Sequence, residues 1–419
     1  MDEDNSISGS REERTSQRRV RLEGRLAEAA LERYGLGGAA LEPLRLGAGF
    51  TQVLRVSSER GEGFALRLYG TPPPSGGGAP AGAADARERR TAALLRSPEV
   101  LASQLAWLSD LGRESGLPVP EPVPLPDGSL LGSVSTRDLG PRGSRLRWAT
   151  RRRDARELEG DLSDTPEMSR NFTLLRWVPG AHRLEGDLSD RDASLVGSYL
   201  AKLHRYAEES GVPEGSAFPR WDWGWPFGAS APLWSEGGAF YSEGEMEVFK
   251  EVSRLVADDL ERLGHGPGAF GVVHRDPKLE NLVFEGGRVG TIDFDMSGLG
   301  HYMLDVRVFR ASLELRQPDR LGPLWKAFLE GYEGERPLPD GHERYLRTFA
   351  VMQRVAAVNR RLALLGSGEE RRGILKNTVP WLERLSKRWG THAGAWLPGP
   401  LAGLLPEELS YVAGVLALL

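Results

Sequence analysis

The segment VVHRDPKLENLVFEGGRVGTIDFDMSGLGHYMLD, residues 272–305, constrains the fold of this chain more than any other stretch. Two short apolar runs lie on either side of a Gly-Gly pair, and this pattern predicts a β-hairpin. Three oxygen-bearing side chains flank the predicted hairpin: Asp276, Asn281 and Asp293. A hairpin brings its two ends together, so we expect these side chains to share one small site.

An acid, a carboxamide and a second acid in this order are the groups that phosphoryl transfer needs. One carboxylate, Asp276, would orient the proton of the attacking nucleophile. Asn281 and Asp293 would supply oxygen ligands for Mg²⁺ on the phosphates of ATP. The alternative is a surface hairpin with scattered charges, and the three fixed spacings between apolar strands favour the site.

This segment resembles the catalytic and metal-binding segment of the aminoglycoside phosphotransferase and choline kinase superfamily, which is related to protein kinases. Within it, the sequence is most similar to bacterial phosphotransferases that include homoserine kinase of the second type and the stress-response kinase. The family pattern is HxDxxxxN, an apolar run, IDFDD, a Gly and a later Asp. The matching residues here are His274, Asp276, Asn281, Ile292–Asp295, Gly300 and Asp305.

The resemblance covers about residues 24–389 and implies an α+β fold of two lobes, like that of protein kinases. The N-terminal lobe would hold a small antiparallel sheet, and the larger C-terminal lobe would be mainly helical. The expected organisation is a disordered leader (1–22), an N-terminal nucleotide-binding lobe (24–125) with a flexible insertion (70–86), a basic inserted loop (126–170), a hinge and C-terminal catalytic lobe (171–389) and a C-terminal extension (390–419).

The resemblance also assigns roles around the predicted hairpin. Asp276 is the expected catalytic carboxylate, with Asn281 and Asp293 as magnesium ligands. Asp295 could assist the metal or the acceptor, or only cap a turn. Asp305 is implied to be a buried structural acceptor for backbone N–H groups of the catalytic loop.

Two further residues of this loop complete the expected catalytic set. His274 would brace the loop through its ring. Lys278, two residues after Asp276, follows the HRDxK wording of protein serine/threonine kinases, in which the Lys contacts the γ-phosphate. Arg275 replaces the small residue common in small-molecule phosphotransferases. Asp293 and Asp305 lie close together in the sequence, which leaves no room for a long activation segment between them. This favours a small-molecule acceptor.

Candidate nucleotide contacts come from earlier in the chain. Gly47 and Gly49 lie between two strand-like runs, where glycines let backbone N–H groups approach phosphate; a plain hairpin turn is the alternative. Arg67, in FALRLYG, takes the place of the Lys that contacts the α- and β-phosphates in most kinases. A surface Arg alternating with Leu66 and Leu68 on a strand is the competing interpretation.

Three more residues belong to this predicted nucleotide site. Gln104 occupies the slot in which the family has a Glu that pairs with the basic strand residue. A Gln can hydrogen-bond Arg67 without neutralising it. Arg176 and Trp177 lie at the end of a strand that resembles the link between the lobes, whose backbone groups would meet the adenine edge.

Two other features have competing interpretations. The tryptophan-rich stretch 219–228 could line an acceptor pocket by stacking on a cation or sugar, but packing of an irregular loop is favoured. His204, on a helix expected over 191–209 with Asp190 as a possible N-cap, is interpreted as a packing histidine. The heptapeptide LEGDLSD occurs twice, at 158–164 and 184–190, without a functional explanation.

Composition narrows the remaining possibilities. With no cysteine, the chain has no disulfide, thiol nucleophile or Cys-ligated zinc. Its net charge of −5 supplies no basic field for nucleic acid. The sequence has no signal peptide and no membrane span, so the expected location is the cytosol. It gives no indication of the oligomeric state.

The leading hypothesis is therefore an enzyme, an ATP-dependent phosphotransferase that uses ATP and Mg²⁺ and phosphorylates a hydroxyl or amine of a small molecule. The second is a protein serine/threonine kinase of the stress-response type. The third is a nucleotide-binding scaffold with little turnover, which the Gln at position 104 and the Arg at position 67 motivate.

Overall fold

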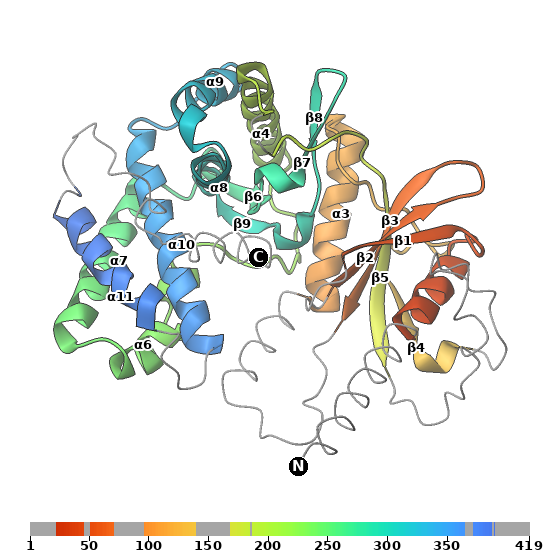
Figure 1. Ribbon diagram of the computed structural model, residues 1–419, viewed down its shortest axis with the longest axis horizontal. Helices are drawn as coiled ribbons and strands as arrows, with labels where there is room; N and C mark the ends of the chain where they lie inside the picture. The colour runs from red at the N-terminus through yellow and green to blue at the C-terminus, as the bar shows by residue number, and fades with distance from the viewer. Residues whose placement is uncertain are drawn as a thin grey trace, which may run out of the picture. The chain divides into compact units, whose positions relative to one another are not determined.

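The computed structural model contains two compact units, each with its own hydrophobic core (Figure 1). The first unit comprises the described residues of Met1–Pro72 and Glu121–Trp177, and the second those of Pro73–Pro120 and Val178–Leu419. An antiparallel sheet in the first unit and a mainly helical second unit confirm the expected α+β, kinase-like fold class. The structure describes residues 22–45, 51–70, 96–139, 168–184, 187–364, 372–387 and 389.

The first unit is built on one five-stranded antiparallel sheet with the order β1-β2-β3-β5-β4. A helix over residues 22–32 packs its apolar face, including Leu26 and Leu31, into the same core as Leu54 and Leu66 of the sheet. The strands are β1 (Ala40–Arg45), β2 (Thr51–Ser57), β3 (Gly63–Gly70), β4 (Gly132–Ser135) and β5 (Ser169–Arg176).

The strand β4 was not expected, because residues 126–170 were assigned to an inserted loop. Residues 126–131 contain a turn, and β4 then pairs with β5 at the edge of the sheet. Its sequence GSVS has one buried apolar residue, Val134, so it lacks the alternation by which a strand is recognised. Gly132 is required there, because a Cβ at this position would collide with the ring of Phe172.

The second unit carries most of the helices and two short β-ribbons. Strand β6 (Phe270–Val273) pairs with β9 (Gly298–His301), and β7 (Leu282–Glu285) pairs with β8 (Arg288–Thr291), both antiparallel. The helices are α3 (Pro98–Ser115), α4 (Asp190–Ser210), α5 (Gly224–Phe227), α6 (Pro232–Glu236), α7 (Glu243–Leu263), α8 (Tyr302–Arg316), α9 (Leu321–Glu333), α10 (His342–Leu364) and α11 (Arg372–Ser386), with single 3₁₀ turns at η1 (Thr136–Asp138), η2 (Gly237–Ala239), η3 (Leu279–Asn281), η4 (Phe294–Met296) and η5 (Pro318–Arg320).

Side-chain caps start the long helices. Ser189 and Asp192 form a capping box on α4, so the N-cap is Ser189 and the expected Asp190 is one residue too late. Ser97 caps α3. This helix belongs to the second unit, although the sequence analysis placed it in the N-terminal lobe. The reason is its buried face, where Trp107 and its neighbours join the larger core. Within the described ranges, no helix combines the length and apolar character needed to cross a bilayer.

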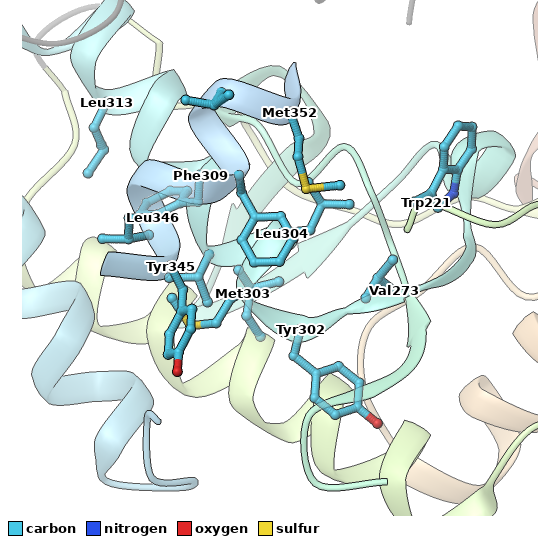
Figure 2. Close-up of a cluster of buried hydrophobic side chains, with 14 of the residues drawn as sticks. Trp221, Val273, Tyr302, Met303, Leu304, Phe309, Leu313, Tyr345, Leu346 and Met352 are labelled. Carbon is cyan, nitrogen blue, oxygen red and sulfur yellow. The ribbon is translucent and has the colours of Figure 1, made fainter. Parts of the chain in front are cut away.

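The core of the second unit lies beneath the catalytic segment. Figure 2 shows Met303, Leu304 and Phe309 of α8 gathered with Leu346 and Met352 of α10, and all five are buried. This packing fixes α8, the helix that follows the segment singled out by the sequence.

Several predicted segments lie wholly or largely outside the described residues. They are the leader apart from Leu22, which is buried in the first core; the insertion 70–86 apart from residue 70; the basic run and first LEGDLSD copy within 140–167; and the extension 390–419.

The crossing of α4 and α9 gives a stability prediction. A Cβ at Gly197 would collide with the backbone carbonyl of Phe328, whereas a Cβ at Gly322 of α9 would meet no atom within 4 Å. We expect Gly197→Ala to lower the free energy of unfolding by about 3 kcal/mol through overpacking. Gly322→Ala is the matched control and should be neutral or stabilising by about 0.5–1 kcal/mol. Urea denaturation measures both, and equal effects would contradict the packing described.

Candidate functional site

The predicted hairpin is present. Strands β7 and β8 are joined by Gly286 and Gly287, which have φ values of 55° and 77°. This left-handed pair is the turn that matches the twist of two antiparallel strands. At the open end, the N–H of Ile292 donates to the carbonyl oxygen of Asn281 at 2.9 Å, which holds the two flanks of the hairpin together.

Asp276 is almost fully buried at the start of this arrangement, with 2% of its surface exposed. Its Oδ2 accepts a hydrogen bond from Nδ2 of Asn281 at 2.9 Å and forms an ion pair with Nζ of Lys278 at 2.8 Å. Its Oδ1 is enclosed and has no hydrogen-bond partner among the described residues. Burial raises the pKa of this carboxyl group, while the charge of Lys278 lowers it and the carboxylate of Asp293 raises it further.

Asn281 is oriented by Asp276. Its Nδ2 donates to both the backbone oxygen and Oδ2 of Asp276, each at 2.9 Å. Both amide hydrogens are therefore used, and the remaining polar atom, Oδ1, is a hard oxygen suited to a cation such as Mg²⁺. The donor set fits a metal that takes only one or two protein ligands and completes its shell with phosphate oxygens and water.

Asp293 and Asp295 lie at the turn after β8. Asp293 has a φ of 67° and is one of two non-glycine residues with positive φ in the described ranges. Such a conformation costs of order 1 kcal/mol or more and is typical of functional sites. Across the part of the chain that the structure describes, no group of three or more His, Asp or Glu side chains could hold a metal alone. A metal here would therefore need the carboxamide of Asn281 and ligands from the substrate.

Gln104 braces this same turn from α3. Its Nε2 donates to the backbone oxygens of Ser297 at 2.8 Å and Asp295 at 3.1 Å, and the side chain is buried. Both amide hydrogens thus hold the turn that carries two predicted metal ligands. This role was not recognised in the sequence, and the pairing of Gln104 with Arg67 stays a prediction.

The ring of His274 connects the catalytic loop to β8. Its Nδ1 accepts from the N–H of Asp276 at 3.2 Å, which places the proton on Nε2. Nε2 then donates toward the backbone oxygen of Ile292 at 3.1 Å, with Oγ1 of Thr291 at 3.0 Å. The ring therefore braces the loop as predicted, while its place in the catalytic set stays a prediction.

Asp305 accepts backbone hydrogen bonds from this loop. Its Oδ2 accepts from the N–H of His274 at 2.9 Å and its Oδ1 from that of Arg275 at 2.7 Å. It is fully buried and also accepts from Nε2 of His204 at 3.1 Å. The predicted structural role of Asp305 is thus confirmed.

Burial lowers the pKa of His204, while the hydrogen bond and the charge of Asp305 act in the opposite direction. Since Asp305 accepts from Nε2, the other ring nitrogen accepts the hydroxyl proton of Tyr332, at 2.8 Å. This confirms His204 as a packing residue and adds that it holds Asp305 in place.

Arg275 has the second positive φ, 74°, and is 2% exposed. Its guanidinium stacks over Trp225, 4.4 Å from the ring centre, and over Trp221, 5.1 Å from the ring centre. Burial lowers the pKa of Arg275 to about 10, so it stays charged at neutral pH.

The tryptophan-rich loop packs onto the catalytic segment, as the sequence favoured. Trp221 is buried, its N–H donates to the backbone oxygen of Leu299 of β9, and Nε1 donates to that of Met296. Trp223 is 38% exposed and donates through Nε1 to the backbone oxygen of Ser253 on α7. The loop therefore joins β9 to α7.

The first unit contains the other predicted nucleotide residues. Gly47 and Gly49 lie outside the described residues. Arg67 is 8% exposed on β3, so the surface interpretation of this residue is wrong. The N–H groups of Arg176 and Trp177 donate to the backbone oxygens of Glu121 and Gly63, which leaves only their carbonyl oxygens for an adenine edge.

The model of the phosphotransferase enzyme family matches residues 40–338. This range includes both β-ribbons of the second unit and the loop 274–281. The chain belongs to the phosphotransferase enzyme family. The family resemblance seen in the sequence is thereby confirmed.

Two curated proteins match this chain over part of their length. A homoserine kinase of Neisseria meningitidis serogroup B is 30% identical over 158 residues, which are 36% of this chain and 47% of that protein. An uncharacterized protein of Deinococcus radiodurans is 27% identical over 253 residues, 58% of this chain and 61% of that protein. The chain thus spans about half to three fifths of these relatives.

Two solved structures share the fold of this chain. A microcompartment-associated aminopropanol kinase has a TM-score of 0.59 and 22% identity, covering 87% of this chain and 98% of that one. The amicoumacin kinase hAmiN, solved with AMP-PNP, Ca²⁺ and amicoumacin, has a TM-score of 0.58 and 15% identity, covering 85% and 92%. At these identities the likeness establishes the fold.

Some residues that support the site were not found from the sequence. Oγ of Ser312 on α8 accepts from the N–H of Leu279 at 2.8 Å, and Oγ1 of Thr291 donates to the backbone oxygen of Asn281 at 3.1 Å. Tyr332 contacts His204 from α9. Each lies in an element that contains other polar residues, so its sequence position alone does not mark it as a support for the site.

The buried carboxylate of Asp305 gives a second stability prediction. In Asp305→Asn an amide group would face a backbone N–H, and we expect a loss of about 3–5 kcal/mol in the free energy of unfolding. The control is Asp190→Asn, because Asp190 is exposed and pairs with Arg320 at 2.6 Å. That substitution should cost no more than about 1 kcal/mol. Comparable losses in the two variants, measured in urea, would show that Asp305 does not support the loop.

Proposed function

We propose that this protein transfers the γ-phosphate of ATP to a hydroxyl or amine of a small-molecule acceptor. The observation that carries the proposal is the asymmetry of the Asp276 carboxylate. Oδ2 is fixed by Lys278 and Asn281, while the buried Oδ1 has no hydrogen-bond partner among the described residues. A buried unsatisfied oxygen is costly, and an acceptor O–H would satisfy it.

Asp276 would act on the acceptor hydroxyl. Its Oδ1 accepts a hydrogen bond from that O–H and aims the oxygen at the γ-phosphorus. As the O–P bond forms and the bond to the leaving ADP breaks, the hydroxyl proton passes to Oδ1. Proton transfer can be late, because phosphoryl transfer depends mainly on positioning and charge neutralisation.

Mg²⁺ would be held by Oδ1 of Asn281 and the carboxylate of Asp293, with Asp295 as a further ligand, and it supplies charge neutralisation on the phosphates. The residues of this chain determine where it can bind. Asp276 orients Asn281 through two hydrogen bonds, and Gln104 holds the backbone of the turn between Asp293 and Ser297.

A small acceptor is favoured over a protein. After Asp293, the chain makes one 3₁₀ turn and strand β9, and then enters α8 at Tyr302. This leaves no segment of the length that protein kinases use to present a peptide. The wording His274-Arg275-Asp276 resembles protein kinases, but Arg275 is stacked on the tryptophan loop.

The first test is ADP formation from Mg-ATP with a panel of small hydroxyl- and amine-bearing metabolites. We expect Asp276→Asn to lower the acceptor-dependent rate about a hundred- to ten-thousand-fold. Asp319→Asn, an exposed residue of η5, is the control and should keep wild-type activity. Radiolabel transferred to protein would instead support a protein kinase. ATP-dependent thermal stabilisation without ADP release would support a scaffold.

The pH dependence gives a second test. Because Asp276 accepts the proton, its ionised form is active, and kcat/KM should fall as the pH drops through its pKa. Burial raises this pKa above the ordinary Asp value of about 3.9. Lys278 lowers it, so Lys278→Met should move the acid limb to higher pH and Lys278→Arg should restore it toward wild type. An acid limb that stays in place, or moves to lower pH, in Lys278→Met would contradict the assignment.

A further inference from the structure

The guanidinium of Arg275 lies beside the proposed catalytic carboxylate. Arg275 directly precedes Asp276, and the charges of Asp276 and Asp305 both act on it. Trp225 and Trp221 lie against the guanidinium, and Figure 2 shows Trp221 extending beside Val273 of β6 at the edge of the core. The side chain is thus held in the loop where an acceptor would approach.

One buried donor of this side chain, Nε, is not satisfied by any residue that the structure describes. Nε is enclosed and has no hydrogen-bond partner, and neither terminal nitrogen donates to any residue in the described ranges. Asp305 accepts two backbone N–H groups, and Oδ2 of Asp276 pairs with Lys278, while Oδ1 of Asp276 makes no hydrogen bond to Arg275. Stacking on two indoles and the charges of Asp276 and Asp305 offset only part of the cost of burying this guanidinium.

The backbone holds the side chain in this position. The φ of 74° is unfavourable for arginine, and it is maintained by the N–H of Arg275 donating to Oδ1 of Asp305 at 2.7 Å. A guanidinium that is rigid, charged and short of acceptors is suited to bind a carboxylate through two parallel hydrogen bonds.

The same contacts change the interpretation of the tryptophan loop. Its indole faces could have bound a cationic ligand, but Arg275 already occupies the faces of Trp221 and Trp225. A second cation there would be repelled. An anionic group is the complementary partner of the guanidinium.

We infer that Arg275 is the anion-binding residue of the acceptor site, and that the acceptor carries a carboxylate near the hydroxyl oriented by Asp276. This inference rests on the proposed function, since it names the acceptor class of the same site. It predicts a hydroxy acid or hydroxy amino acid as acceptor, and not a simple amino alcohol.

The test compares three probes of equal chain length by calorimetry: 4-hydroxybutanoate, butane-1,4-diol and 4-aminobutan-1-ol, each with Mg-AMP-PNP present. We expect the wild-type protein to bind the carboxylate about ten- to a hundred-fold more tightly than the diol, the range of one charge-assisted bidentate contact. Arg275→Met should remove this preference, and Arg275→Lys should keep part of it because the charge remains.

Arg220→Met is the matched control. Arg220 also lies over an aromatic ring, Phe270, but it pairs with Asp222 at 2.7 Å and its side chain is 55% exposed. The carboxylate preference should survive this substitution. A purely structural Arg275 would lower stability when replaced and leave the relative affinities unchanged.

Three results would overturn the inference: equal or tighter binding of the diol or amino alcohol by wild type, a preference that persists in Arg275→Met, or no binding of the carboxylate. The wild-type comparison decides the matter even if the variant does not fold. Phosphorylation of the amino alcohol would reject this inference and uphold the phosphotransferase proposal. Carboxylate binding through Arg275 without any phosphoryl transfer would do the reverse.

Discussion

The acceptance of two consecutive backbone N–H groups by the buried carboxylate of Asp305 is the interaction on which the site depends. It fixes the backbone of His274 and Arg275 from helix α8, which the core beneath it holds in place. His204 holds the carboxylate from α4. Without this acceptor, the buried N–H groups of His274 and Arg275 would lack hydrogen-bond partners. The carboxylate of Asp305 therefore makes the loop conformation possible.

The proposed catalytic residues lie close to this anchor along the chain. The loop presents Asp276 with one oxygen tied to Lys278 and Asn281 and the other without a partner in the described part of the chain. The hairpin returns the chain to Asp293, whose left-handed backbone, like that of Arg275, is a strained conformation for a residue other than glycine. The backbone of Arg275 is held by Asp305, and the turn that follows Asp293 is held by Gln104.

The sequence predicted the local parts of this arrangement well, because they depend on local rules. Two glycines between apolar runs specify the hairpin, and fixed spacings bring Asn281 and Asp276 together. The parts that were missed are long-range contacts. Gln104 lies 193 residues from Ser297, whose oxygen it binds, and no pattern near Gln104 indicates that partner. Strand β4 was missed because pairing with β5, and not its own sequence GSVS, makes it a strand.

Asn281 and Asp293 are proposed to present oxygen together to a divalent ion on the phosphates of ATP, next to Oδ1 of Asp276, which has no hydrogen-bond partner in the described part of the chain. A crystal structure with AMP-PNP and Mn²⁺, in which anomalous scattering locates the manganese, tests this most directly. The account predicts manganese within about 2.2 Å of Oδ1 of Asn281 and of a carboxylate oxygen of Asp293. Manganese bound elsewhere, with Oδ1 of Asn281 hydrogen-bonded to protein, would contradict it.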